Sequence, residues 1–381
     1  MNPIQIPQEL RDLEAAYSAR GHRMWLVGGC VRDHVRGVSA KDVDIATTAT
    51  PDEQVAICDE AGFRWFGTGL QHGTLTVLAG GEAYEITTLR TDVETDGRHA
   101  TVAFTRDLAT DLERRDLTFN AIAMTFDGEV TDLFGGVEDA KAGRVRFVGD
   151  AGTRIREDFL RILRWFRFKG RFQSEITEGG DDLAAITGNV GGLSVISVER
   201  VWSEISRILA GGRPAGIIDL MEQAGVLTVL GLPSTRERAT DALAEMRRHT
   251  DDPAALLVAW LGPWAGEFAG RWKLSNAERE TVRFLGARLQ QDAYGIADAK
   301  FDLVDGIERR LVEIVLKTRF SDKALRELVA WDTPTFPVAG RDLLNAGHPA
   351  GKSMGERLRR MKTAWIESDY TMDKDGLMVI A

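Results

Sequence analysis

Two aspartates, Asp42 and Asp44, stand two residues apart in the segment DVDIAT. In a β-strand this spacing projects both side chains from one face. Adjacent carboxylates repel each other, and a hard divalent cation such as Mg²⁺ relieves that repulsion. Mg²⁺ typically binds one or two carboxylates together with water and the phosphate oxygens of a substrate. The pair therefore predicts a catalytic metal site that supports an in-line displacement at a nucleoside triphosphate.

A glycine-rich turn precedes the aspartates. Gly28 and Gly29 end the apolar run Met24–Val27, and Arg32 follows them. Glycines let backbone N–H groups approach a triphosphate, the start of a following helix favours anions, and an arginine adds a charge-assisted contact. Each feature alone also has an ordinary explanation. Asp42 and Asp44 fit exposed surface acids, and Gly28 and Gly29 fit a tight turn. Cys30, between the glycines and Arg32, is interpreted as a packing residue rather than a nucleophile.

Together the motifs GGxVRD and DxD resemble the nucleotidyltransferases of the polymerase-β superfamily, in the class of the bacterial CCA-adding enzymes and poly(A) polymerases. Four further segments, TGLQHGTLTV, YEITTLR, RRDLTFNAIAM and REDFLRILRWFRF, are similar to that family and follow in its order. The resemblance covers roughly the first half of the chain. It implies an enzyme that adds CCA to the 3′ end of tRNA without a nucleic-acid template, with Mg²⁺ as cofactor and CTP and ATP as substrates.

Two alternatives stay open. A poly(A) polymerase, or an enzyme that adds only A, belongs to the same family and uses the same chemistry. A non-catalytic RNA-binding protein on this fold comes from another class, and the intact pair Asp42 and Asp44 speaks against it.

Two more residues are assigned to the reaction by matching these segments. Glu85, in YEITTLR, is a candidate third catalytic carboxylate, although a surface acid at a strand edge fits nearly as well. Arg115, in RRDLTFNAIAM, matches a triphosphate contact of the family. Arg114 and Asp116 are interpreted as an ion pair that fixes the segment carrying Arg115, and Asn120 is expected to cap local backbone.

The segment EDFLR suggests how a protein selects a base. Asp158 and Arg161 fall at the start of a predicted helix and share one of its faces. A carboxylate accepts from the exocyclic amine of cytosine or adenine while a guanidinium donates to the ring nitrogen, and uracil and guanine reverse this polarity. Unpaired buried polar groups discriminate far better than shape. The alternative interpretation is that Asp158 and Arg161 form an ordinary salt bridge on the helix surface.

Arg164 and Arg167 match further nucleotide contacts of the family. Helix rotation, however, takes Arg167 about half a turn away from Asp158. Trp165 is expected to pack in the core.

The polar stretch 89–107 is interpreted as a mobile loop. It contains DGRHA, which is similar to the loop that the family needs to switch from C to A addition. Ala100 stands where the family usually has proline.

The second half of the chain is predicted to be helical. Ile196–Leu209 is amphipathic and resembles the family's neck, with Ser197 as a candidate N-cap and Arg200 paired with Glu204. The C-terminal segment AGHPAGKSMGERLRRMKTAWIESDY has a glycine-rich turn before a basic helix and resembles the family's tail, which implies contact with the tRNA elbow. The residues assigned to tRNA there, for which a solvated helix face fits equally well, are Lys352, Arg357, Arg359 and Arg360.

The elements that must position these residues follow from periodicity and turn signals. A helix is expected at Gln8–Arg20, and β-rich segments at Met24–Val27, Val43–Ala46, Thr74–Leu78, Ala83–Thr88 and Asn120–Phe126. From Thr153 onward the pattern is helical. The fold class is α+β: an N-terminal polymerase-β-like head with a small mixed sheet, then an all-helical neck, body and tail. The expected boundaries are 1–150, 151–212, 213–333 and 334–381.

Composition narrows the remaining possibilities. The formal net charge of −10 over 381 residues does not favour RNA binding, but the basic runs 154–171 and 352–362 supply local positive charge. The two cysteines, Cys30 and Cys58, indicate a reducing compartment. With no apolar span of membrane length and no leader, a cytoplasmic protein without a membrane or obligatory protein partner is expected. The absence of HExxH and His-Asp motifs argues against zinc hydrolysis.

Overall fold

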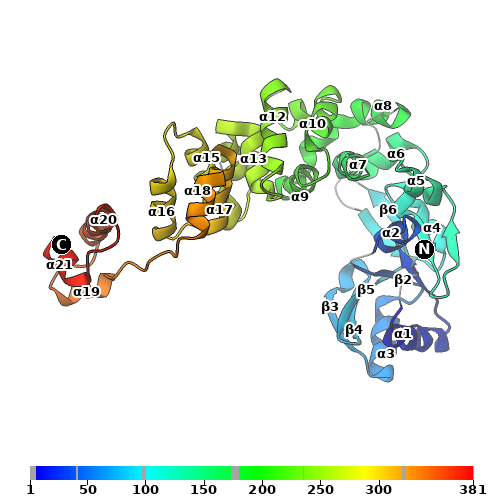
Figure 1. Ribbon diagram of the computed structural model, residues 1–381. Helices are drawn as coiled ribbons and strands as arrows, with labels where there is room; N and C mark the ends of the chain where they lie inside the picture. The colour runs from blue at the N-terminus through cyan, green and yellow to red at the C-terminus, as the bar shows by residue number, and fades with distance from the viewer. Residues whose placement is uncertain are drawn as a thin grey trace. The chain divides into compact units, whose positions relative to one another are not determined.

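The computed structural model describes residues 6–39, 42–95, 100–172, 180–234, 236–319 and 322–380. The chain forms two compact units. The first consists of Met1–Thr240 with Arg271–Leu274, and the second of Asp241–Gly270 with Ser275–Ala381. All strands that the structure describes belong to the first unit, and helices make up the second (Figure 1).

A seven-stranded mixed sheet organises the N-terminal part, in the order β3-β4-β5-β2-β1-β8-β9. Its neighbouring strands pair antiparallel except β2 and β5, which are parallel. The strands are β1 (Met24–Val27), β2 (Asp44–Thr47), β3 (Arg64–Gly69), β4 (Thr74–Ala79), β5 (Glu82–Thr88), β8 (Ile122–Met124) and β9 (Val130–Asp132). The predicted α+β head with a mixed sheet is confirmed.

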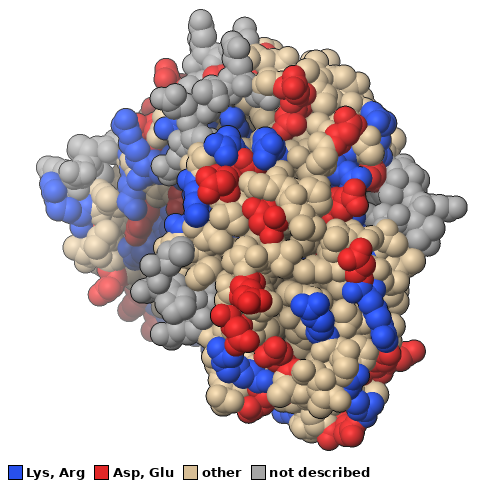
Figure 2. Space-filling model, turned by 90° about the vertical axis from the view of Figure 1, so that its right-hand side faces the viewer, with Lys and Arg blue, Asp and Glu red and all other residues tan. Residues whose placement is uncertain are grey.

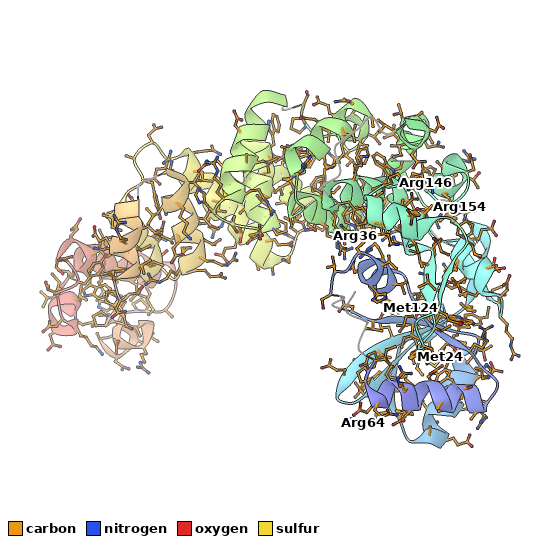
Figure 3. The ribbon with its side chains drawn as sticks, turned by 45° about the vertical axis from the view of Figure 1, so that its right-hand side comes forward. Met24, Arg36, Arg64, Met124, Arg146 and Arg154 are labelled. Carbon is orange, nitrogen blue, oxygen red and sulfur yellow. The ribbon has the colours of Figure 1, made fainter. Side chains whose placement is uncertain are left out.

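Alternating burial fixes which face each strand turns to the core. Along β5, Tyr84 and Ile86 are buried while Glu85 between them is exposed, as the two-residue period of a strand requires. Met24 of β1 and Met124 of β8 are also buried within the sheet (Figure 3).

Helices cover the sheet. α1 (Gln8–Ala19) and α3 (Pro51–Ala61) pack against each other and against β4 (Figure 1). Thr50 caps α3 in a capping box with Glu53, which satisfies free N–H groups at the helix start. α2 (Gly29–Val35), α4 (Leu108–Glu113) and α5 (Gly136–Ala142) complete this region.

Three segments differ from the sequence expectation. Asp42 precedes β2, which begins at Asp44, and residues 118–120 form a 3-10 turn before β8. The stretch 89–107, which was expected to be a loop, contains two strands, β6 (Arg90–Thr95) and β7 (Ala100–Phe104), which form an antiparallel hairpin. This stretch is rich in threonine and valine, which favour extended backbone. Residues 96–99, with most of the DGRHA motif, lie outside the described residues.

The rest of the first unit is helical. Its helices are α6 (Ala151–Glu157), α7 (Leu160–Arg171), α8 (Gly180–Asn189), α9 (Val198–Leu209), α10 (Pro214–Gln223) and α11 (Val226–Val229). α7 packs against α9, and the ring of Phe119 makes edge-to-face contacts with Phe168 of α7 and with Phe172 at its end. Figure 3 shows Arg36, at the end of α2, facing this region, where its guanidinium lies 4.2 Å from the centre of the Phe172 ring.

The second unit consists of helices, in which α15 packs against both α13 and α17. α12 (Arg236–Arg247) leads into it, and it contains α13 (Pro253–Leu261), α14 (Ala265–Arg271), α15 (Asn276–Gln290), α16 (Ile296–Val304), α17 (Arg309–Arg319), α18 (Asp322–Val329), α19 (Gly340–Asn345), α20 (Lys352–Glu367) and α21 (Lys374–Val379). Trp365 is the centre of a separate core cluster around α20. Among the described helices, none has the length and apolar character to cross a membrane. The finer division at residues 150, 212 and 333 stays a prediction.

Candidate active site

A polar cavity of about 1100 Å³ opens in the first unit, between the sheet and helices α7 and α9. Its described lining includes ten arginines against five aspartates, so the wall is strongly positive in a chain whose net charge is −10. Elsewhere the charges are mixed: on the face shown in Figure 2, basic and acidic side chains are interspersed. A concave positive wall of this kind suits a polyanionic ligand.

The structure brings most of the sequence-predicted residues to this one cavity. Those that line it are Gly28, Gly29, Arg32, Asp42, Asp44, Arg115, Asp158, Arg161, Arg164 and Arg167. The charged lining residues that were not predicted as nucleotide or metal contacts are Arg90, Asp111, Arg114, Asp116, Arg171, Arg200 and Arg207. Arg171 had a usable signal, because it continues the three- and four-residue spacing of the arginines along α7.

The two aspartates line the cavity at the start of strand β2. Asp44 starts β2 and is the register partner of Glu85 on the parallel strand β5. Burial raises the pKa of the Asp44 carboxyl, the negative charges of Glu85 and Asp42 add to this, and Arg115 opposes it. Because neighbouring negative charges contribute to the raised pKa of Asp44, negative charge is concentrated at this point.

This donor set fits a hard divalent cation. Mg²⁺ typically binds one or two carboxylates, with substrate oxygens and water completing its shell, and here two carboxylates lie in an arginine-rich cavity. Within the described parts of the chain, no group of three or more histidine, cysteine or acidic side chains is already closed around a metal position. Glu85 is not among the residues that line the cavity, although its negative charge contributes to the raised pKa of Asp44.

Gly28 lies where a side chain would not fit beside Arg115. Its backbone has φ of +68°, and a Cβ at this position would lie 3.2 Å from Nη1 of Arg115. Any side chain would therefore be strained and would displace Arg115. Arg32, one turn along α2, is 5% exposed and donates to both carboxylate oxygens of Asp33 and to Oδ1 of Asn120. These contacts fix its guanidinium beside the glycines.

Asp111 holds the arginine pair of RRDLTFNAIAM. It is 2% exposed and accepts from Arg114 at 2.9 Å and from Arg115 at 3.0 Å. Burial alone raises its pKa, but the two guanidinium groups outweigh burial and leave the pKa below its ordinary value. The expected pair of Arg114 with Asp116 was wrong, because α4 places Asp111 three and four residues before the arginines.

Asp116 instead bonds to helix α7. Its Oδ2 lies 2.6 Å from Nη2 of Arg164, and its Oδ1 accepts from Nδ2 of Asn120. Asn120 in turn accepts from Arg32. The expectation that Asn120 caps local backbone was therefore wrong, since its amide joins two side chains of the cavity wall.

The helix expected around Asp158 is broken at that residue. α6 ends at Glu157, Asp158 is extended with φ of −154°, and α7 begins at Leu160. As a result Asp158 and Arg161 are not an i, i+3 pair on one helix. Arg161 donates to Glu157 at 2.6 Å, while Asp158 accepts from the Leu160 N–H and from Arg200. Both side chains still line the cavity.

The predicted pair of Arg200 with Glu204 within α9 was also wrong. Glu204 is buried and accepts from Arg167 at 3.3 Å and from Arg207 at 3.4 Å. Burial lowers the pKa of Arg167 to about 10, and Glu204 opposes that shift. Arg167 lies on the cavity wall despite its rotation from Asp158 along the chain, because the break before α7 removes the simple helical relation between the two.

Two neighbours of the site are structural. Trp165 is 1% exposed, and its indole N–H donates to the carbonyl oxygen of Val145. Cys30 is equally buried, its thiol donates to the carbonyl oxygen of Val27, and burial raises its pKa. Both are core residues, as expected.

The basic residues assigned to tRNA belong to α20 in the second unit. Lys352, Arg359 and Arg360 are exposed and Arg357 is half-buried, whereas Met361 and Trp365 are buried. α20 therefore has a packed side and a basic side.

Comparisons with known proteins agree with this geometry. Residues 24–146 match the family of the poly A polymerase head domain, and residues 182–236 match a family described as a probable RNA and SrmB-binding site of polymerase A. The chain is 37% identical over 389 residues to mitochondrial CCA tRNA nucleotidyltransferase 1 of Mus musculus, covering 97% of this chain and 88% of that protein. It is 39% identical to the CCA-adding enzyme of Geobacillus thermodenitrificans, covering 94% and 92%.

A solved structure shares the fold over almost its whole length. The crystal structure of the Bacillus stearothermophilus CCA-adding enzyme in complex with CTP superposes with a TM-score of 0.77 at 30% identity, covering 96% of this chain and 94% of that one. Relatives at this level of identity are matched from end to end, and the cavity carries the motifs of a nucleotidyltransferase. The chain therefore belongs to the family of the CCA-adding tRNA nucleotidyltransferases, within the wider group of poly A polymerase head domains.

Proposed function

We propose that this protein adds CCA to the 3′ end of tRNA, using CTP and ATP, by Mg²⁺-dependent nucleotidyl transfer without a nucleic-acid template. The observation that carries the proposal is that one cavity is lined both by Asp42 and Asp44, at the start of β2, and by Asp158 with the arginines of α7. Such a cavity places the reacting phosphate and the base of one nucleotide under the control of separate groups of side chains.

The reaction is an in-line displacement. The oxygen of the RNA 3′-hydroxyl attacks the α-phosphorus of the incoming nucleotide, a new P–O bond forms, and the bond to the β-phosphate oxygen breaks to release pyrophosphate. A bound Mg²⁺ supplies Lewis-acid neutralisation of phosphate charge. Asp42 and Asp44 would hold it, and their position beside Glu85 favours binding of a cation.

The triphosphate is bound by groups that the fold fixes in advance. Gly28 leaves backbone room, and Arg32 and Arg115 are each held by a buried or nearly buried carboxylate, Asp33 and Asp111. Preorganised cations need little rearrangement when charge shifts to the leaving pyrophosphate. This arrangement supports binding of any nucleoside triphosphate, so the base must be read elsewhere.

Asp158 and Arg161 read the base. The carboxylate of Asp158 accepts from the exocyclic amine of cytosine or adenine. Arg161 already makes bonds to Glu157 and to the carbonyl oxygens of Arg154 and Arg114. Since a guanidinium has five N–H donors, it retains donors for a ring nitrogen. The contacts that use some of the donors of Arg161 also fix the position of its guanidinium.

The experiment is an incorporation assay on tRNA that lacks its 3′ CCA. CTP alone should add two C residues, ATP alone should extend a tRNA that already ends in CC by one A, and the mixture should give CCA and stop. Long A tracts from ATP alone would identify a poly(A) polymerase and overturn the proposal. A protein that binds tRNA without incorporating any nucleotide would be the non-catalytic alternative.

For the second unit, the proposed role is to bind tRNA away from the 3′ end. The basic side of α20 suits backbone phosphates and 2′-hydroxyls, which A-form RNA offers largely without sequence. The tRNA elbow is the proposed contact. A cytoplasmic location stays a prediction from the composition.

A further inference from the structure

Each carboxylate oxygen of Asp158 accepts from a different segment. The backbone N–H of Leu160 donates to Oδ1 at 3.1 Å, and Nη2 of Arg200 donates to Oδ2 at 2.7 Å. Leu160 begins α7 and Arg200 lies on α9, so the carboxylate is held from two helices at once. Since each oxygen has two lone pairs, both contacts leave acceptor capacity for a base.

Helix α9 is a rigid support for Arg200. One turn further along, the buried Glu204 joins α9 to Arg167 of α7. On the same helix, the ring of Trp202 stacks on that of Trp272, with centroids 5.9 Å apart. A side chain that projects from an element fixed on several sides can orient its partner.

The ion pair itself is only partly buried. The side chains of Arg200 and Asp158 retain 35% and 26% of their exposure. Partly exposed ion pairs add little to stability, because solvent screens them. The main consequence of this contact is therefore the orientation of the Asp158 carboxylate rather than the stability of the fold.

We propose that Arg200 is a positioning residue for base selection, which holds the Asp158 carboxylate at the angle that accepts an exocyclic amine. It acts through Asp158 and does not itself touch the reacting atoms. The inference rests on the proposed function, since it assumes that Asp158 reads the base. The sequence identifies α9 only as an amphipathic packing helix. The proposal adds that α9 contributes to the fidelity of nucleotide selection.

The test compares the incorporation of CTP and UTP by single variants. Arg200→Met removes the guanidinium but keeps an unbranched, helix-compatible side chain. Discrimination between CTP and UTP, measured as the ratio of kcat/KM values, should fall roughly 5- to 30-fold. Arg200→Lys should recover part of this loss, because an ammonium keeps the charge but lacks the planar fork of arginine. Glu199→Gln is the matched control, since Glu199 lies on the same helix and its bond to Lys273 is exposed.

A double variant tests whether Arg200 acts through Asp158. In an Asp158→Ala background, Arg200→Met should cause no further loss of discrimination, because two residues that act as one unit are not additive. Additive losses, or an unchanged CTP to UTP ratio in Arg200→Met, would overturn the inference. Thermal unfolding should show all variants folded; if Arg200→Met is not, the ratio for Arg200→Lys decides.

Failure of the inference is distinguishable from failure of the proposed function. A wild-type protein that completes CCA while Arg200→Met keeps full discrimination overturns the inference alone. A wild-type protein that adds only A overturns CCA addition, and the same variants then report on discrimination between ATP and GTP.

Discussion

Arg164 on α7 and Asp116 in the segment before β8 form an ion pair, with Nη2 and Oδ2 2.6 Å apart. Burial by itself raises the pKa of the Asp116 carboxyl, but Arg164 and the hydrogen bond from Asn120 outweigh burial and hold the pKa well below its ordinary value. Asp116 in turn raises the pKa of Arg164. The pair joins α7, which follows the proposed base-reading Asp158, to the segment that carries Arg115, the proposed triphosphate contact.

The pH dependence of this pair is testable with Asp116→Asn. A depressed carboxyl pKa contributes stability that is present above the unfolded value of about 3.9 and is lost as the pH falls towards the folded value. The variant should be less stable by on the order of 3 kcal/mol at neutral pH, because it leaves Arg164 without its counter-charge. Calorimetry should find this difference constant between about pH 5 and pH 8 and smaller below about pH 4. A difference that changes near pH 6 would contradict the assignment.

Replacing either aspartate of the metal site should stop catalysis without stopping RNA binding. Asp42→Ala and Asp44→Ala are each expected to reduce kcat by about 10³-fold or more, since the variant lacks a ligand for the ion that neutralises phosphate charge. The dissociation constant for tRNA should stay within about twofold in a filter-binding assay. Glu129→Gln, an exposed acid in the same part of the chain, is the control. Undiminished turnover in both aspartate variants would refute the metal assignment.

Asp158→Ala should relax base choice. Loss of the acceptor removes the penalty for an oxygen at the position of the amine, so misincorporation of UTP should rise by about 10²-fold or more relative to CTP. The products can be sequenced after reaction with all four nucleotides. Asp181→Ala, at an exposed position on α8, should behave like the wild type. Continued rejection of UTP by Asp158→Ala would remove the role of this carboxylate in reading the base.

A substitution of Trp165 can distinguish a role in core packing from a role in stacking on a base. Because the ring is 1% exposed and its N–H is bonded to Val145, Trp165→Phe should lower the free energy of unfolding by about 2 kcal/mol. The KM values for CTP and ATP should stay the same at a temperature where the variant is folded. A selective rise in either KM would show that the ring contacts a base.

The basic side of α20 is expected to affect tRNA and not nucleotide. Replacing Lys352, Arg357, Arg359 and Arg360 by glutamine should raise the KM for full-length tRNA and leave that for CTP unchanged. The slope of log K against log salt should become shallower by about 0.7 to 0.9 for every phosphate that the variant no longer neutralises. A minihelix without the elbow serves as the control substrate, and an equal effect on both RNAs would contradict the proposed contact.

Local pattern was enough to predict the elements that carry the chemistry. The sequence predicts the strand Met24–Val27, which the structure confirms, and the predicted DxD segment, glycine turn and arginines of α7 all line one cavity. Such features depend on the residue itself and on its neighbours in the chain, which a sequence displays directly.

Charge partners could not be predicted in the same way. The i, i+3 and i, i+4 rules assume an uninterrupted helix, and the break at Asp158 invalidates them there. Arg200 and Glu204 stand at that spacing on an intact helix, yet both have partners across the interface with α7 or its start. Tertiary packing decides which acid an arginine pairs with. The places of Asp111 and Arg200 in the site therefore could not be predicted from the sequence.

Every described residue that lines the cavity lies between Val27 and Gly212, within the first unit. Synthesis from the N-terminus therefore completes the nucleotide pocket before the second unit has left the ribosome. Insertions, deletions or exchanges after residue 274 therefore leave every residue that lines the cavity unchanged, together with Arg271–Leu274, the later segment that belongs to the first unit.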